Sequence, residues 1–171
     1  MPVTSYLVAI GSNRRHHRHG LPGDVVAAAM VALSTVGEVE RRSTIIRSAA
    51  MGPAGRDFAN AAVLVRSSLD PPAMLCGLKR LEGQFGRRRG RRWGQRVLDL
   101  DIIFWSGGTW QSPGLFVPHP GAAARAFVLQ PLSEIAAQWR HPVSGLSVRH
   151  LYRRLTAPRP KHRGRACPGG S

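Results

Sequence analysis

The sequence is poor in cysteine and has no long apolar stretch. Two of its 171 residues are cysteine, so neither a disulfide framework nor a cysteine-ligated metal site is expected. No apolar run approaches the roughly 20 residues that a membrane-spanning helix needs. Met1 leads directly into a strand pattern rather than into a signal peptide. We therefore expect a cytoplasmic protein with no membrane partner.

Acidic residues are also scarce, with 9 Asp and Glu against 25 Lys and Arg, and the formal net charge is +16. Such a charge attracts polyanions, but nucleotides, RNA and anionic membranes all qualify. With 43% hydrophobic residues, the chain can bury one core, and we expect a single domain over residues 1–156. Residues 157–171 are basic and rich in Pro and Gly, which predicts a disordered tail.

Two signatures of nucleotide-binding loops are missing from the chain. It contains neither G-x-x-x-x-G-K-[ST] nor a G-x-G-x-x-G that opens a helix, and it shows no internal repeat. A nucleotide site in this protein must therefore depend on side chains and a metal ion.

The most informative segment runs from Arg87 to Ile103. The strand pattern from Leu98 to Phe104 places Asp99 and Asp101 on one side and apolar residues on the other. At about 3.3 Å per residue, these two carboxylates leave the backbone about 6 to 7 Å apart, which suits one shared metal ion or two. Mg²⁺ prefers such a small number of carboxylates, completed by phosphates and water. An isolated D-x-D is otherwise more often part of a solvated strand face.

Arginines crowd the residues just before these aspartates and weaken that alternative. They surround Gly90 and Gly94, which indicates a flexible connection able to close over a ligand. Guanidinium groups bind phosphate oxygens in a planar fork, and the indole of Trp93 offers a stacking face. A solvated or nucleic-acid-binding basic loop is the alternative. The arginines are Arg87, Arg88, Arg89, Arg91, Arg92 and Arg96.

Helix and strand patterns follow one another in the order typical of a split β-α-β fold. Asp70 and Pro71 are a typical helix start, as N-cap and first helical residue. We predict an α+β, ferredoxin-like fold, with an antiparallel sheet, both helices on one face and short C-terminal helices. The predicted strands span 6–10, 39–47, 58–65 and 98–104, and the helices span 24–33, 71–85, 132–135 and 148–155.

Three further features are candidates for a site. Lys79 and Glu82 lie near the end of the second helix, where they either face the site or form an exposed charge pair. His119 stands between two prolines that hold it in place, so it can donate to a phosphate oxygen, although such a histidine is more often a turn residue. The histidines of residues 14–19 are more typical of a mobile cationic loop than of a metal site.

Five short motifs occur in series between Tyr6 and Leu155. They are Gly11-Ser12-Asn13, 58–63, Gly86-Arg87 with 92–96, 98–102, and 117–120 with Arg125, Phe127 and 131–136. Each is weak alone, but together they resemble the 6-hydroxymethyl-7,8-dihydropterin pyrophosphokinases of folate biosynthesis. The resemblance implies a ferredoxin-like fold and transfer of the β,γ-pyrophosphoryl group of ATP to the pterin hydroxymethyl oxygen, with release of AMP.

The same resemblance implies roles for individual residues. Two Mg²⁺ ions are expected on Asp99 and Asp101, with ATP and the pterin as partners, and we expect a monomer that does not bind nucleic acid. The residues that match the catalytic set are Arg87, Arg96, Asp99 and Asp101. Those that match ATP contacts are Lys79, Glu82, Arg89, Arg92, Ile102, His119 and Arg125, and those that match pterin contacts are Ser48, Met51, Phe58, Asn60, Trp93 and Phe127.

Two departures from the family pattern leave alternatives open. Gln95 stands where the family usually has proline, and residues 48–52 replace a more proline-rich pterin-binding loop. An inactive family member is one alternative. A basic nucleic-acid-binding module is the other, but it does not explain Asp99 and Asp101, whose charges would repel a nucleic acid.

Overall fold

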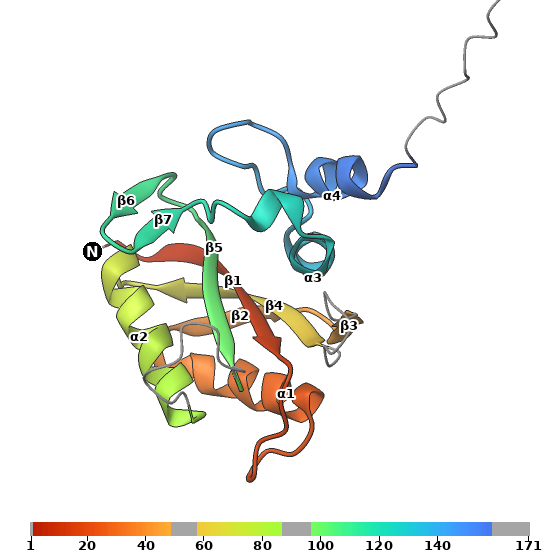
Figure 1. Cartoon of the computed structure of the whole chain (residues 1–171). Helices are drawn as coiled ribbons and strands as arrows, with labels where there is room; N and C mark the ends of the chain where they lie inside the picture. Colours follow the sequence, from red (N-terminus) through yellow and green to blue (C-terminus); the bar gives the residue numbers. More distant parts are fainter. Residues whose placement is uncertain (1, 49–57, 87–96, 159–171) are drawn as a thin grey trace, which may run out of the picture.

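The computed structural model describes residues 2–48, 58–86 and 97–158, and its centre is a five-stranded sheet (Figure 1). The order is β2-β4-β1-β5, with β3 paired beside β4, and every pairing is antiparallel. This order confirms the predicted ferredoxin-like sheet. The strands are β1 (Thr4–Ser12), β2 (Glu38–Arg42), β3 (Ile46–Ser48), β4 (Phe58–Ser67) and β5 (Asp99–Trp105).

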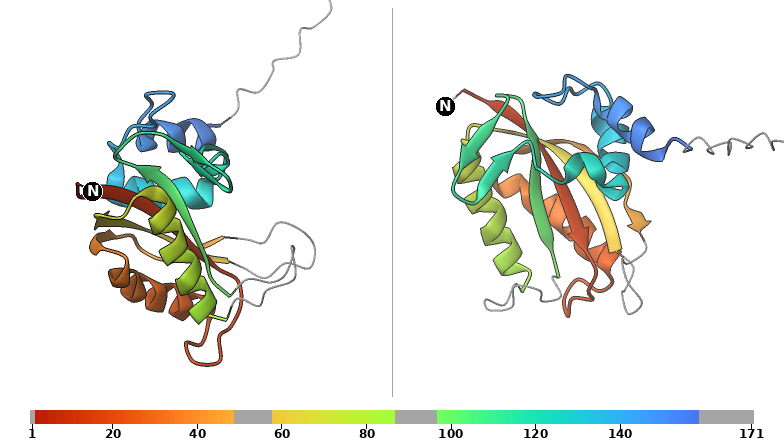
Figure 2. Two further views of the ribbon diagram at one scale, coloured as in Figure 1. Left: turned by 90° about the vertical axis from the view of Figure 1, so that its left-hand side faces the viewer. Right: turned by 45° about the horizontal axis from the view of Figure 1, so that its top comes forward.

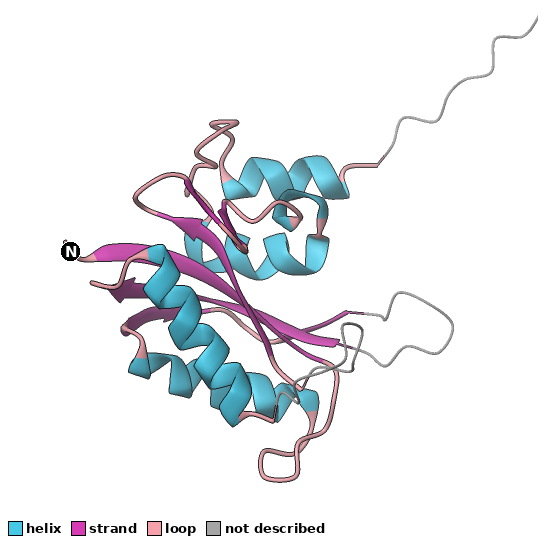
Figure 3. Cartoon of the chain, turned by 60° about the vertical axis from the view of Figure 1, so that its left-hand side comes forward, coloured by secondary structure: helices cyan, strands magenta, loops and turns pink. Residues whose placement is uncertain are grey.

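Helices cover both faces of this sheet, as the two further views show (Figure 2). The helices α1 (Pro22–Ala32) and α2 (Pro71–Gln84) share one face, whereas α3 (Ala126–Ala136) and α4 (Val148–Thr156) lie on the other (Figure 3). Short 3-10 turns at Leu33–Thr35 and Ala122–Ala124 and a small hairpin complete the described elements. None of the helices in the described ranges is long and apolar enough to span a bilayer.

The alternation of side chains along the strands divides the interior into two hydrophobic cores. In β1, Tyr6, Val8 and Ile10 are buried with α1 and α2, whereas Leu7 is buried on the opposite face with α3 and α4. Ala9 and Gly11 continue the series that begins with Leu7. Towards the end of β1, the residues on the face that α3 covers are small, so the second core contains little apolar volume there.

The predicted start of α2 is confirmed in detail. The Asp70 side chain accepts a hydrogen bond from the Ala73 amide at 2.8 Å, and Pro71 occupies the first helical position. Met74, Leu78 and Leu81 bury one face of the helix against the sheet. This packing carries the last turn of α2, with Lys79 and Glu82, to the outer edge of β5.

The predicted strand over 39–47 is wrong, because the chain breaks into β2 and β3 around Ser43. Ser43 is buried, and its amide donates to the Ala62 carbonyl while its hydroxyl accepts from the Ala62 amide. The next residue, Thr44, donates from its amide and its hydroxyl to Glu134 of α3. These side-chain bonds replace the regular ladder at the break.

The C-terminal half also departs from the sequence-based boundaries. α3 is a full helix rather than the short segment expected near 132–135, and it accommodates Pro131 within its length. A hairpin of β6 (Trp110–Ser112) and β7 (Leu115–Val117) follows β5, and neither of these strands is among the predicted ones.

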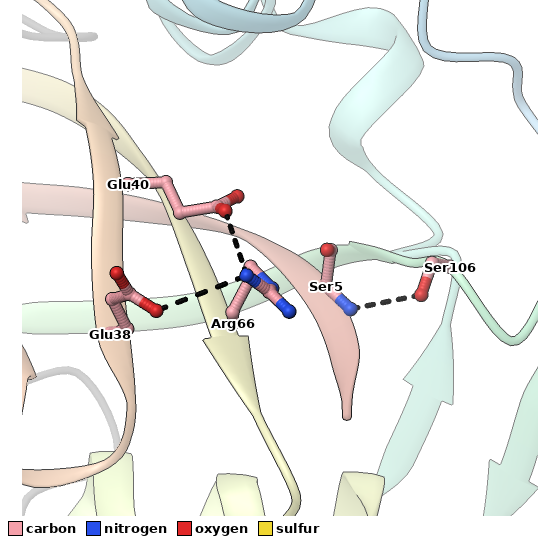
Figure 4. Close-up of polar contacts among 5 residues, drawn as sticks. All are labelled: Ser5, Glu38, Glu40, Arg66 and Ser106. Atoms are coloured by element: carbon pink, nitrogen blue, oxygen red, sulfur yellow. Dashed lines mark hydrogen bonds and ion pairs between the residues drawn. The ribbon is translucent and has the colours of Figure 1, made fainter. Parts of the chain in front are cut away.

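Charged contacts mark the end of the sheet that lies away from the predicted site residues (Figure 4). Arg66 of β4 approaches Glu38 at 4.0 Å and Glu40 at 3.6 Å on the neighbouring β2. Because these side chains are exposed, the pairs contribute little to stability. Arg66 is six residues from Asn60, or about 20 Å along an extended strand.

Candidate active site

Three neighbouring strands bring the predicted metal and pterin residues into one row of the sheet. Gly11 of β1 lies opposite Asp99 of β5 on one side and opposite Asn60 of β4 on the other. Directly paired residues project from the same face, so the side chains of Asp99 and Asn60 share that face. With strands about 4.8 Å apart, their Cα atoms are separated by about 10 Å across Gly11.

The sheet surface between these two side chains is formed by Gly11 and Ala9. Ala9 is paired with Asp101 on β5 and with Ala62 on β4. A Cβ atom added to Gly11 would lie 3.5 Å from Asn60 Oδ1, so this position faces the row. The predicted strand ended at residue 10, whereas β1 continues through Gly11 to Ser12. The signal that was overlooked is the alternation of small residues with the large Val8 and Ile10.

The aspartate pair projects as the strand pattern predicted, and charged side chains of both signs lie near Asp101. Burial raises the pKa of Asp101, and the adjacent charge of Asp99 raises it further, as does Glu82, while His119 and Lys79 oppose the rise. Such crowded carboxylates fit a divalent cation, which favours their ionised form. No cluster of three or more His, Cys, Asp or Glu suited to a metal occurs in the described ranges.

Glu82 and Lys79 form a contact that the sequence left undecided. The Glu82 side chain is 0% exposed, so an exposed charge pair is the wrong interpretation. Its Oε1 accepts from Lys79 Nζ at 2.6 Å and from the backbone amide of Leu100 at 3.0 Å. Leu100 lies between Asp99 and Asp101, so the end of α2 is joined directly to the backbone of the aspartate pair.

His119 is fixed against the same strand. Its amide donates to the Ile103 carbonyl at 3.0 Å, and its ring Nδ1 accepts from the Gly121 amide at 3.1 Å. This acceptor role leaves the proton of a neutral imidazole on Nε2. The guanidinium of Arg125 lies beside Gly121, since a Cβ there would be 3.3 Å from it. Two donors for phosphate oxygens therefore flank Gly121.

The described pterin candidates lie on the face that carries Asn60. Asn60 is 5% exposed, and its Nδ2 donates to Ser48 Oγ at 2.7 Å, which fixes the orientation of the amide. Phe58 is two residues earlier on β4, on the same face, and is 37% exposed. Phe127 is half-buried at the start of α3, which packs over this face. The Ser48 contact was not deduced from the sequence, because it joins two strands.

The histidine-rich loop packs against the end of α2. His16 is buried, and its Nδ1 accepts from the amides of Arg18 and His19 at 3.1 and 3.3 Å. The rings of His16 and His19 are stacked, and His19 stacks in turn on Phe85 with centroids 4.8 Å apart. Burial lowers the pKa of His16, and the neighbouring His17, His19 and Arg18 lower it further. The loop is thus a folded turn in the described structure, without the ligand set of a metal site.

The remaining predicted site residues divide into two groups. Ile102 is buried in the core beneath α1 and α2. Met51, Arg87, Arg89, Arg92, Trp93 and Arg96 lie outside the described residues, as do Gln95 and most of the predicted tail. The described residues that border the arginine segment are Gly86, just after α2, and Val97, just before β5.

Comparison with known proteins gives one consistent result. Residues 7–137 match the family model of 7,8-dihydro-6-hydroxymethylpterin-pyrophosphokinase. A 2-amino-4-hydroxy-6-hydroxymethyldihydropteridine pyrophosphokinase of Synechocystis sp. is 41% identical over 145 residues, which cover 85% of this chain and 73% of that protein. The Haemophilus influenzae protein with the same description is 36% identical over 138 residues, 79% of this chain and 82% of that protein. These relatives give no support to the nucleic-acid-binding alternative.

Solved structures give the same architecture. A crystal structure of wild-type Plasmodium falciparum HPPK-DHPS with pteroate matches with a TM-score of 0.71 and 12% sequence identity. The match covers 89% of this chain but only 44% of that longer chain. At this identity the likeness concerns the fold, which agrees with the sheet order and the helix layers described above.

Proposed function

We propose a catalytic arrangement for this chain, which belongs to the 7,8-dihydro-6-hydroxymethylpterin-pyrophosphokinase family. It transfers the pyrophosphoryl group of ATP to 6-hydroxymethyl-7,8-dihydropterin and forms the pterin diphosphate and AMP, a step in folate biosynthesis. The observation that carries the arrangement is the row of Asp99, Gly11 and Asn60 across three paired strands. It sets a nucleotide-metal end and a pterin end about 10 Å apart on one face.

At the nucleotide end, Asp99 and Asp101 hold Mg²⁺, and we propose two ions. Bound Mg²⁺ would neutralise phosphate charge and fix the geometry of the triphosphate. His119 Nε2 donates to a phosphate oxygen, because its Nδ1 is already engaged by Gly121. The Arg125 guanidinium, beside Gly121, provides a second cationic donor. Lys79 and Ile102 remain predicted ATP contacts, whereas the buried Glu82 supports this end through its hydrogen bond with the Leu100 amide.

At the pterin end, Asn60 reads the edge of the heterocycle. Its Nδ2 is held by Ser48, so the amide is oriented before the ligand arrives. Phe58 and Phe127 stack on the flat ring from β4 and α3, which suits a bicyclic aromatic ligand. Met51 and Trp93 remain predicted contacts outside the described residues.

Between the two ends, the pterin hydroxymethyl oxygen attacks the β-phosphorus of ATP. A new oxygen-phosphorus bond forms, the bond to the oxygen bridging the α- and β-phosphorus breaks, and AMP leaves with that oxygen. The proton of the hydroxymethyl group is released. We propose that Arg87, Arg89, Arg92 and Arg96 neutralise charge on the leaving group, since their segment begins and ends beside α2 and β5. Positioning and charge stabilisation supply most of the rate in such reactions.

We also propose that the enzyme acts as a cytoplasmic monomer. The described members of the row all belong to this chain, as a monomeric enzyme requires. An equilibrium sedimentation measurement at micromolar concentration tests the monomer.

The direct test is AMP release with ATP, Mg²⁺ and the reduced hydroxymethylpterin. We expect turnover by the wild type and a loss of at least about 10²-fold in Asp99→Asn and Asp101→Asn, because each removes a metal-binding charge. Glu38→Gln, at the far end of the sheet, is the matched control and should keep wild-type turnover. Undiminished turnover in both aspartate variants would contradict the metal assignment, and a wild type that releases no AMP would favour an inactive family member.

A further inference from the structure

We propose that Glu82 is a positioning residue that fixes the strand backbone between Asp99 and Asp101, so that both carboxylates are held in register for the metal-nucleotide complex. This inference rests on the proposed metal role of the two aspartates. Glu82 would act on the carboxylates indirectly, by holding the backbone of β5.

The hydrogen bond to Leu100 occupies a place that a further strand would otherwise fill. In the described sheet, β5 lies at the edge, with β1 on its inner side. The Leu100 amide donates to Glu82 Oε1 at 3.0 Å rather than to another strand. A backbone amide at a buried edge is costly when unpaired, so this acceptor fixes the local conformation of β5.

The Leu100 amide lies between the two aspartates, so its hydrogen bond with Glu82 affects the position of both. Leu100 is 0% exposed and packs in the core below the sheet, while its two neighbours, Asp99 and Asp101, project to the opposite face. The backbone between the aspartates is therefore held from below by Leu100 and from the outer edge by Glu82. A rotation of the strand about its axis would displace both carboxylates together.

Lys79, on the same helix, pairs with the Glu82 carboxylate. Lys79 Nζ lies 2.6 Å from Glu82 Oε1, and its side chain is 38% exposed. A buried carboxylate is tolerated when it is paired and hydrogen-bonded. The same Oε1 atom accepts from both groups, so the helix, the ion pair and the strand amide form one connected unit.

Two conservative substitutions separate the hydrogen bond from the charge. Glu82→Gln keeps a carbonyl oxygen at the same reach but removes the charge, whereas Glu82→Asp keeps the charge and shortens the side chain by one methylene group. The binding of Mg²⁺ with α,β-methylene-ATP is measured by calorimetry, with a parallel titration in EDTA. If the oxygen positions the backbone, we expect Glu82→Gln to bind within about threefold of wild type and Glu82→Asp at least about tenfold more weakly. The EDTA titration should change by less than about twofold in both.

A matched control distinguishes positioning from general stabilisation. Ser43→Ala removes another buried side-chain acceptor of a strand amide, that of Ala62 on β4, which β1 separates from the aspartates on β5. It should lower the melting temperature without changing Mg²⁺-dependent nucleotide binding. The proposal is overturned if Glu82→Asp binds as tightly as Glu82→Gln or more tightly, or if both variants behave like Ser43→Ala.

Absence of the proposed pyrophosphokinase activity is recognised by a separate measurement, AMP release by the wild type. If the wild type releases no AMP, the proposed activity is wrong whatever the Glu82 variants do. If the wild type is active and binds the nucleotide only with Mg²⁺, the order of the two Glu82 variants alone decides the positioning role.

Discussion

Substitution of Gly11 should impair catalysis while leaving the fold intact. An added Cβ would lie 3.5 Å from Asn60 Oδ1, an ordinary van der Waals distance, so Gly11→Ala creates no clash with the residues that the structure describes. Glycine in a strand costs about 0.5 to 1 kcal/mol relative to alanine through backbone entropy. For a chain of this length, the melting temperature of Gly11→Ala should therefore stay the same or rise by about 1 to 4 °C.

The same substitution should lower the rate of catalysis, although it does not lower the melting temperature. The new side chain projects from the sheet between Asp99 and Asn60, where the triphosphate and the pterin must meet. Reacting atoms must approach to about 3 to 3.5 Å, and a displacement of about 1 Å can cost about 10²-fold in rate. We expect Gly11→Ala to lower kcat by about tenfold and Gly11→Val, with two more carbon atoms, by about 10²-fold.

The assay is initial AMP release at saturating ATP and pterin, with thermal denaturation of the same preparations. Gly23→Ala is the matched control, because a Cβ at that position in α1 would meet no other described part of the chain within 4 Å. It should keep full turnover. A folded Gly11→Val with wild-type kcat would refute the inferred position of the reacting groups, and an unfolded Gly11→Ala would refute the packing argument.

Two further predictions concern polar contacts. Ser48→Ala removes the acceptor that orients Asn60, at a cost of about 1 kcal/mol. The KM for the pterin should therefore rise about fivefold, with the KM for ATP unchanged. An equal rise in both KM values would argue against a role of Ser48 in pterin binding. Burial lowers the pKa of His141 below its value in the unfolded chain, so its contribution to stability is present above pH about 6.5 and is lost as the pH falls through the folded pKa. His141→Asn keeps an acceptor for the Val143 and Ser144 amides, and its melting temperature should fall less between pH 7 and pH 5 than that of the wild type. Parallel pH curves for the two proteins would show that His141 does not contribute.

Local sequence signals determined much of the architecture. Asp70 and Pro71 predicted the start of α2, because capping depends on neighbouring residues alone. The strand period placed Asp99 and Asp101 on one face for the same reason. The prediction failed at Ser43, where bonds to Ala62 and the contacts of Thr44 with α3 interrupt the strand. Such contacts join residues far apart in the chain and leave no local periodicity.

For the site, the sequence by itself determined the chemical groups, namely paired carboxylates, phosphate donors and the amide and aromatic residues that resemble a pterin site. Only the tertiary structure decided how they are combined. The register of β1 between β4 and β5 placed Asp99, Gly11 and Asn60 in one row, and the packing of α2 brought Glu82 to the Leu100 amide. Register and packing depend on the burial of both faces of the sheet at once, which no single segment of sequence specifies.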